Sequence, residues 1–173
     1  AAAAAGSELI LDALLERDAA AVRARDALQN TPLHSAAAAG RASAVQACLA
    51  RGSECDARNR AGCTPLALAA SHGGVEALRL LLEQGADVHA CDAEGNTALH
   101  RAAAYAHLGA VGVLLEAGAP LYAANRNGAS PLVLAAPHPA VSARLLEQAA
   151  RLAAQGDPQA SMAQATLTPT PQP

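Results

Sequence analysis

Cysteine and histidine are the residues of this chain that could most readily hold a metal ion, form a disulfide or act as a nucleophile. The chain has six histidines and four cysteines: Cys48, Cys55, Cys63 and Cys91. No two cysteines form a C-x-x-C pair, and no histidine pair has zinc-finger spacing. We therefore predict no metal site, no cofactor and no disulfide framework. Reduced thiols suit an intracellular protein of the cytoplasm, with the nucleus as an open alternative.

Acid–base chemistry would need carboxylates, histidines or serines that act together. Four acidic residues could be imagined as such a set: Glu54, Asp87, Asp92 and Glu94. Each recurs at a position of the repeating pattern described below, where it is expected to face solvent or to cap a turn. No carboxylate or serine stands at triad spacing from His34 or His100. We therefore predict no catalytic residue, and the chain is not expected to be an enzyme.

The composition favours closely packed helices and excludes two classes of partner. Apolar residues make up 52% of the 173 residues, yet aromatic residues make up only 1%. Alanine, the best helix former, supplies much of the apolar content. The net charge is −3 with no run of basic residues, so nucleic acid is not expected as a partner. No apolar stretch approaches the ~20 residues that span a bilayer, so membrane insertion is not expected either.

The chain contains an internal repeat. Four similar tetrads begin at positions 31, 64, 97 and 130, so the step between them is constant. The tetrads are Thr31-Pro32-Leu33-His34, Thr64-Pro65-Leu66-Ala67, Thr97-Ala98-Leu99-His100 and Ser130-Pro131-Leu132-Val133. An alanine pair follows each tetrad, and in three of the units a glycine comes at the same distance past the threonine, as Gly52, Gly85 and Gly118. A fixed period of this length is the signature of a stacked repeat architecture.

The residues of each unit predict two short helices and a turn. The Thr or Ser that opens a tetrad can cap a helix, and proline fits the first helical position. A second helix follows, with inward positions such as Leu78, Leu81 and Leu82 in the second unit. The segment around Asp92 and Gly95 predicts a turn that projects sideways. One unit cannot bury its apolar face alone, so the units must stack.

These signals resemble the ankyrin repeat family. The stretches T-P-L-H-S-A-A at 31–37 and G-A-D-V-H-A at 85–90 are close to that family's pattern, and the resemblance covers about residues 7–152. It implies an all-α, ankyrin-repeat solenoid of stacked helix-turn-helix units with projecting β-hairpin-like loops. It also implies a non-catalytic scaffold that binds another protein, and we expect the chain to be a monomer.

The repeat divides the chain into segments. We expect a flexible N-terminal stretch at 1–6 and an ankyrin repeat domain at 7–155. The domain comprises a partial unit at 7–26 and units at about 27–59, 60–92, 93–125 and 126–155. Residues 7–17 could be a second helix of a unit or a divergent cap; both remain open. Residues 156–173, rich in Pro, Thr and Gln, predict a disordered tail or linker.

The fourth unit departs from the pattern. Pro137 and Pro139 should cut its first helix short. Leu145 repeats Leu81, but two full steps from Leu81 would reach position 147, so two residues are missing. The last helix should bury one stripe that includes Val141 and Leu145 and expose its other face, as a terminal cap requires.

The resemblance implies that partners contact the hairpin tips and the faces of the first helices. Carried over by register, the candidate partner-binding residues are Arg60, His72, Glu94, Asn96, Arg101, Tyr105, Arg126 and Asn127. Tyr105 could instead fill the alanine-rich seam, which leaves two roles open for it. Two further expectations follow from register: Cys63 lies exposed at a hairpin tip, and His138 shares a row with His72 and Tyr105.

Two alternative functions remain open at this stage. The chain could be a regulatory or targeting ankyrin segment of a larger enzyme, such as a ubiquitin-ligase subunit, kinase or channel. It could also be a structural spacer. The sequence does not identify the partner.

Overall fold

The computed structural model describes residues 23–155 of the chain. Within this range the chain folds into eight α-helices and no β-strand, which confirms the predicted all-α solenoid. The helices are α2 (Pro32–Ala38), α3 (Ala42–Ala50), α4 (Pro65–His72), α5 (Val75–Glu83), α6 (Ala98–Ala104), α7 (Leu108–Glu116), α8 (Pro131–Leu134) and α9 (Pro139–Ala154). The expected flexible stretch 1–6, most of the partial unit 7–26 and the expected tail 156–173 lie outside the described residues.

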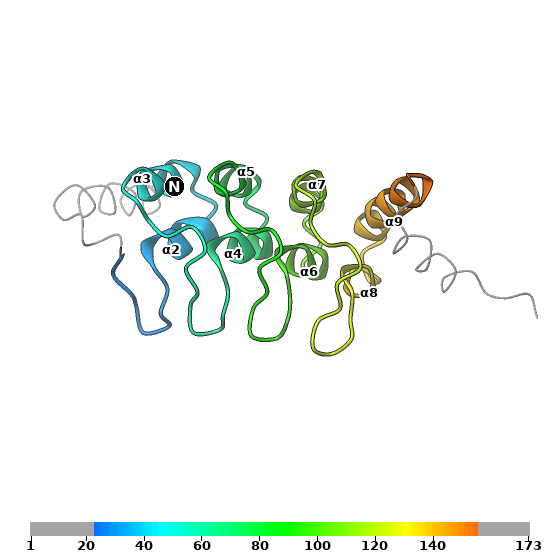
Figure 1. Ribbon diagram of the computed structural model, residues 1–173, viewed down its shortest axis with the longest axis horizontal. Coiled ribbons are helices and arrows are strands. Elements are labelled where there is room, and N and C mark those ends of the chain that lie inside the picture. The colour runs from blue at the N-terminus through cyan, green and yellow to red at the C-terminus, as the bar shows by residue number, and fades with distance from the viewer. Residues whose placement is uncertain (1–22, 156–173) are drawn as a thin grey trace, which may run out of the picture.

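The helices lie in two rows (Figure 1). The first row holds α2, α4, α6 and α8, the second row holds α3, α5, α7 and α9, and consecutive helices of each row are in contact. Four hairpin-like loops project beyond the first row on one side (Figure 1). We call residues 26–30, 59–63, 92–96 and 125–129 the first to fourth hairpins.

The helix starts follow from the tetrads. The side chain of Thr31, Thr64, Thr97 or Ser130 accepts a hydrogen bond from the backbone N–H three residues later. This bond satisfies one of the donors that a helix start leaves unpaired. Proline stands at the first position of α2, α4 and α8, where no N–H is needed. The predicted caps are therefore confirmed.

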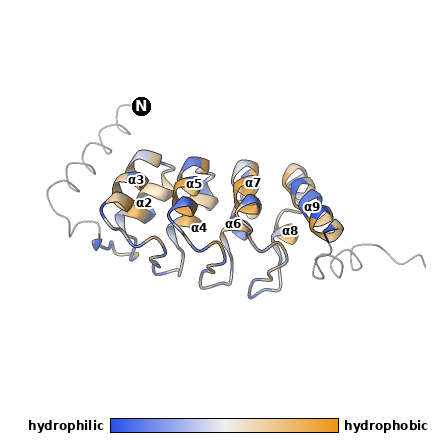
Figure 2. Ribbon diagram, turned by 45° about the horizontal axis from the view of Figure 1, so that its top comes forward, coloured by the Kyte–Doolittle hydropathy of each residue, from blue (hydrophilic) through white to orange (hydrophobic). Residues whose placement is uncertain are grey.

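The core runs the length of the stack as one apolar cluster. The tetrad leucines Leu33, Leu66 and Leu99 are almost completely buried, and so are Leu78 and Leu114 of the second row. Buried alanines lie between them in every unit, and their small side chains let neighbouring helices approach closely. Figure 2 shows hydrophilic and hydrophobic residues side by side on α9, as an amphipathic end helix requires.

The fourth unit closes the described part of the stack. Its first helix, α8, has only 4 residues, and Pro139 begins the 16-residue α9. The predicted shortening is therefore confirmed. Val141 and Leu145 are buried on the side of α9 that packs on α7, while Arg144 pairs with the exposed Glu147 at 3.1 Å.

Candidate functional site

Each hairpin is closed by the side chain of its first residue. In the third hairpin, Oδ1 of Asp92 accepts hydrogen bonds from the backbone N–H groups of Glu94 at 2.9 Å and Asn96 at 2.8 Å. The same two bonds form on Asp26, Asn59 and Asn125 in the other hairpins. Aspartate and asparagine both offer this oxygen, so either type can occupy the position. The turn holds the intervening residues outward.

Backbone bonds join neighbouring hairpins into one continuous edge. The N–H of Arg60 donates to the carbonyl of Leu28 at 2.9 Å, and the N–H of Ala93 donates to Ala61 at 3.0 Å. The N–H of Arg126 donates in the same way to Glu94 at 2.9 Å. These bonds hold the four hairpin tips in fixed positions relative to one another.

Side-chain amides reinforce two of the three hairpin junctions. Nδ2 of Asn59 donates to Oδ1 of Asn30 at 2.9 Å, and Nδ2 of Asn125 donates to Oδ1 of Asn96 at 2.8 Å. We call each such bond an amide rung. Between the second and third hairpins no rung can form, because Asp92 has no side-chain N–H and Cys63 replaces the accepting asparagine.

Arg101 bridges that junction instead. Its Nε donates to Oδ2 of Asp92 at 3.0 Å, and a terminal nitrogen donates both to that oxygen and to Sγ of Cys63, the latter at 3.1 Å. Burial would raise the pKa of Asp92, but the bonds from the Asn96 backbone and from Arg101 outweigh it, so the pKa lies below its ordinary value. We call this set the Asp92–Arg101–Cys63 bridge.

The bridge corrects one expectation. Cys63 was expected at an exposed tip, yet it is only 3% exposed, because Arg101 of the next unit covers it. Burial raises the pKa of the Cys63 thiol. Asp92 was expected either to face solvent or to cap a turn. It caps a turn, as the bonds above show, and it is buried.

A shallow groove of about 260 Å³ lies beside the third and fourth hairpins. It brings together five of the eight candidate binding residues: Glu94, Asn96, Arg101, Tyr105 and Asn127. His100, Ala104, Asn125 and Leu134 complete its lining. We call it the Tyr105 groove. Leu134 was not among the candidates, but it lies one full repeat period after Arg101, so the register could have indicated it.

Tyr105 brings an exposed aromatic ring to the groove. It ends α6 and is 59% exposed, with its ring centroid 6.5 Å from that of His107. A side chain this exposed does not fill the alanine-rich seam, and its role in partner binding stays a prediction. A tyrosine supplies a large contact area at low entropic cost, and it is a typical anchor of protein interfaces.

The remaining three candidates lie outside the Tyr105 groove. Arg60 and Arg126 are exposed at the tips of the second and fourth hairpins, and His72 is exposed at the end of α4. Nδ1 of His72 donates to the carbonyl of Leu68 at 2.9 Å, which fixes its ring. These residues extend the surface but are not gathered into one hollow.

His138 does not share the row of Tyr105, so that expectation was wrong. It stands at the start of α9, where its Nε2 donates to the carbonyl of Ala104 at 3.1 Å. His107 stands at the start of α7 and donates in the same way to Ser71 at 2.9 Å. The two missing residues of the fourth unit therefore precede His138 and shift it to the position equivalent to His107.

His34 and His100 hold the start of their own helix and link it to the next hairpin. Nδ1 of His34 accepts from the N–H of Thr31 at 3.1 Å, and Nε2 donates to the carbonyl of Cys63 in the next hairpin at 3.0 Å. His100 makes the equivalent bonds, including one to Ala129 at 3.1 Å. Burial lowers the pKa of both imidazoles, although the carbonyl bond opposes the shift.

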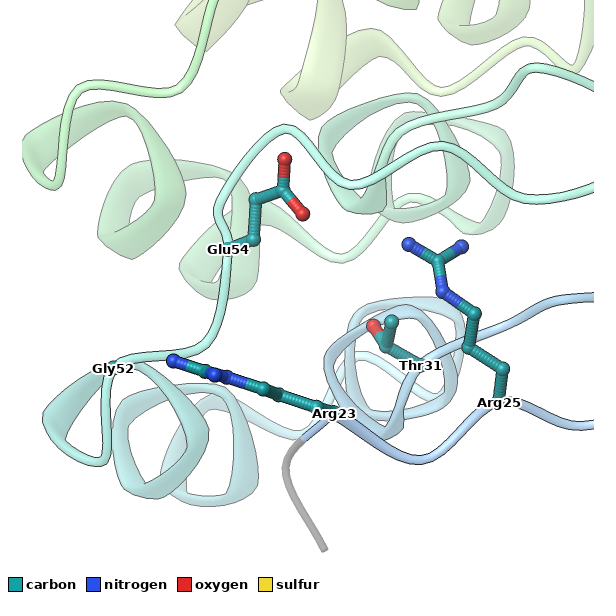
Figure 3. A pocket seen from close by; sticks show the side chains of 5 residues that line it. All are labelled: Arg23, Arg25, Thr31, Gly52 and Glu54. Atoms are coloured by element: carbon teal, nitrogen blue, oxygen red, sulfur yellow. The ribbon is translucent and has the colours of Figure 1, made fainter. Parts of the chain in front are cut away.

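A second hollow, of about 380 Å³, lies at the start of the described residues. Figure 3 shows Arg23 and Arg25 reaching into it from the N-terminal side and Glu54 from the loop after α3. Arg25 donates to the backbone carbonyl of Gln29 in the first hairpin at 3.3 Å and to that of Arg58, the residue before the second hairpin, at 2.8 Å. We assign no binding role to this hollow.

Between residues 23 and 155 no three His, Cys, Asp or Glu side chains come together in a way that could hold a metal ion. None of the helices in that part of the chain is long and apolar enough to cross a membrane.

Comparisons with known proteins identify the repeat. A family model described as ankyrin repeats in three copies matches residues 1–92, and a model described as an ankyrin repeat matches residues 94–126. No curated protein matches the chain significantly.

Proposed function

Because the chain belongs to the ankyrin repeat family, whose members are generally protein-interaction modules, we propose that it is a non-catalytic scaffold that binds a partner protein. The proposed binding surface runs along the hairpin tips and the first helices of the second to fourth units. The observation that carries the proposal is the Tyr105 groove, where an exposed aromatic side chain lies among polar groups held in place by the hairpin bonds.

The surface has the composition of a protein interface. Exposed Arg60 and Arg126 alternate along it with Glu94, so the charge is mixed. A mixed surface suits the polar and charged groups of a protein better than the uniform negative charge of a phosphate backbone. Tyrosine and arginine are the residue types that most often carry binding energy at interfaces.

The test begins with a partner isolated by affinity capture on the full chain. Replacing Tyr105 and Arg60 together with alanine should weaken binding by about 2 kcal/mol or more. Both side chains are exposed, so the melting temperature should change little.

Matched controls lie on the opposite row. Glu76 and Arg79 are exposed on α5, and their replacement by alanine should change the affinity by less than ~0.5 kcal/mol. If the control variants abolish binding while the Tyr105 and Arg60 variant does not, the proposed surface is wrong and the partner contacts the second helices.

A further inference from the structure

We infer that the Tyr105 groove accepts a lysine or arginine side chain of the partner protein. This inference rests on the proposed function and adds the chemistry of the group that the groove recognises. It follows from the charge of the groove, from its exposed aromatic ring and from its small apolar walls.

The charge of the groove comes from Glu94. Arg101 also lines the groove, but its charge is compensated by Asp92, whose side chain is 1% exposed and contacts the guanidinium group directly. Glu94 is exposed, and its Oε2 accepts from Nδ2 of Asn96 at 3.1 Å. Its Oε1 has no hydrogen-bond partner between residues 23 and 155. The groove therefore offers one uncompensated negative charge on an oriented carboxylate.

The ring of Tyr105 adds a second attraction for a cation. Tyr105 is 59% exposed and lines the same groove as Glu94, and the electron-rich face of an aromatic ring attracts ammonium and guanidinium groups. Ala104 and Leu134 provide apolar surface beside it. The aliphatic stem of a lysine or arginine packs on such surface while its charged end reaches a carboxylate.

The groove also discriminates against acidic side chains. An incoming carboxylate would meet Glu94, and the guanidinium group that lines the groove, that of Arg101, is already bound to Asp92. Arg126 donates its backbone N–H to Glu94, but its side chain neither lines the groove nor forms an ion pair with Glu94 in the described part of the chain. Repulsion of the wrong charge is a common source of specificity.

The test uses a random 12-residue peptide library displayed on phage and selected on the full-length chain. We expect lysine and arginine to be enriched among the selected peptides. One selected peptide, labelled with a fluorophore, is then titrated with the protein, and its dissociation constant is measured by fluorescence anisotropy. The same peptide with its basic residue replaced by alanine is the probe for the recognised group.

Glu94→Gln should raise the dissociation constant of the peptide by about fivefold or more, because the substitution removes the charge and keeps the hydrogen bond from Asn96. The control is Glu116→Gln on α7, which removes an exposed charge from the second row, where it pairs with Arg79, and should change the affinity less than about twofold. Melting temperatures of both variants confirm that they are folded. The peptide with alanine should bind the wild-type protein more weakly than the original peptide does. The loss of affinity should be similar to that caused by Glu94→Gln.

The outcomes separate the two proposals. Peptides that lose binding to Tyr105→Ala but carry no basic residue, or that bind Glu94→Gln and Glu116→Gln equally, would overturn the basic-side-chain inference and leave the proposed surface intact. Peptides that bind Tyr105→Ala and Glu94→Gln as well as wild type would contradict the proposed surface, and a library that yields no peptide would count against both.

Discussion

Ala106→Gly should make the protein more stable, although it removes a methyl group. Ala106 follows α6 with a positive φ of 60°, whereas the equivalent positions hold Gly40 and Gly73, at φ of 65° and 70°. A left-handed conformation costs an L-residue roughly 1–2 kcal/mol. Glycine avoids that cost but adds about 0.5–1 kcal/mol of chain entropy to the unfolded state. The difference is a net gain of about 0–1.5 kcal/mol, with a midpoint of about 0.75 kcal/mol.

The assay is equilibrium unfolding by heat and by guanidinium chloride, followed by circular dichroism. For a chain of this size the midpoint of the gain corresponds to a rise in melting temperature of about 1–4 °C. The control is the same chemical change at Ala143, which is exposed inside α9 with helical backbone, and there it should cost about 1 kcal/mol. If Ala106→Gly destabilises the protein as much as Ala143→Gly does, the left-handed conformation assigned to Ala106 is wrong.

Three further perturbations test the packing and the buried polar groups. Burial lowers the pKa of His34 and His100 below 6.5, so their contribution to stability is complete above pH 6.5 and is lost as the pH falls below it. The melting temperature should therefore fall between pH 7.5 and pH 5. It should fall less steeply in a variant in which both histidines are replaced by asparagine. Asp92→Asn should cost about 1–3 kcal/mol by leaving Arg101 without its ion pair, measured by chemical unfolding, and adding Arg101→Leu should restore part of that loss. Ala70→Leu should overpack a fully buried position of α4 and cost about 1–3 kcal/mol in the same assay, whereas no loss would show that the stack is loose there.

Periodicity predicts most of this fold because the same local chemistry recurs in every unit. A threonine, a proline and a leucine in fixed order determine where α4 begins and which side it buries, and the structure confirms both. The fourth unit shows the limit of that reasoning. Alignment of Leu145 revealed that two residues are missing but not where, so His138 was assigned to the wrong position.

The Tyr105 groove was predictable in part. Register identified the outward positions, and five of those residues do line one hollow. The burial of Cys63 was not predictable in this way, because it depends on a side chain of the following unit that reaches back across a junction. Register describes what the units share, whereas the Asp92–Arg101–Cys63 bridge exists only where they differ.

That bridge restricts how this chain could have changed in length during evolution. Arrays of equivalent units can gain or lose one by unequal recombination, since each new boundary resembles the old ones. Deleting residues 64–96 would keep the repeat period. The helix that carries Arg101 would then follow the hairpin that begins at Asn59 and not the one that begins at Asp92. Asn59 has no carboxylate, so Arg101 would lose its ion pair. The same event would leave Asn125 facing Cys63 in place of Asn96. Selection for stability would therefore act against this deletion, and the bridge helps to preserve the order of these units.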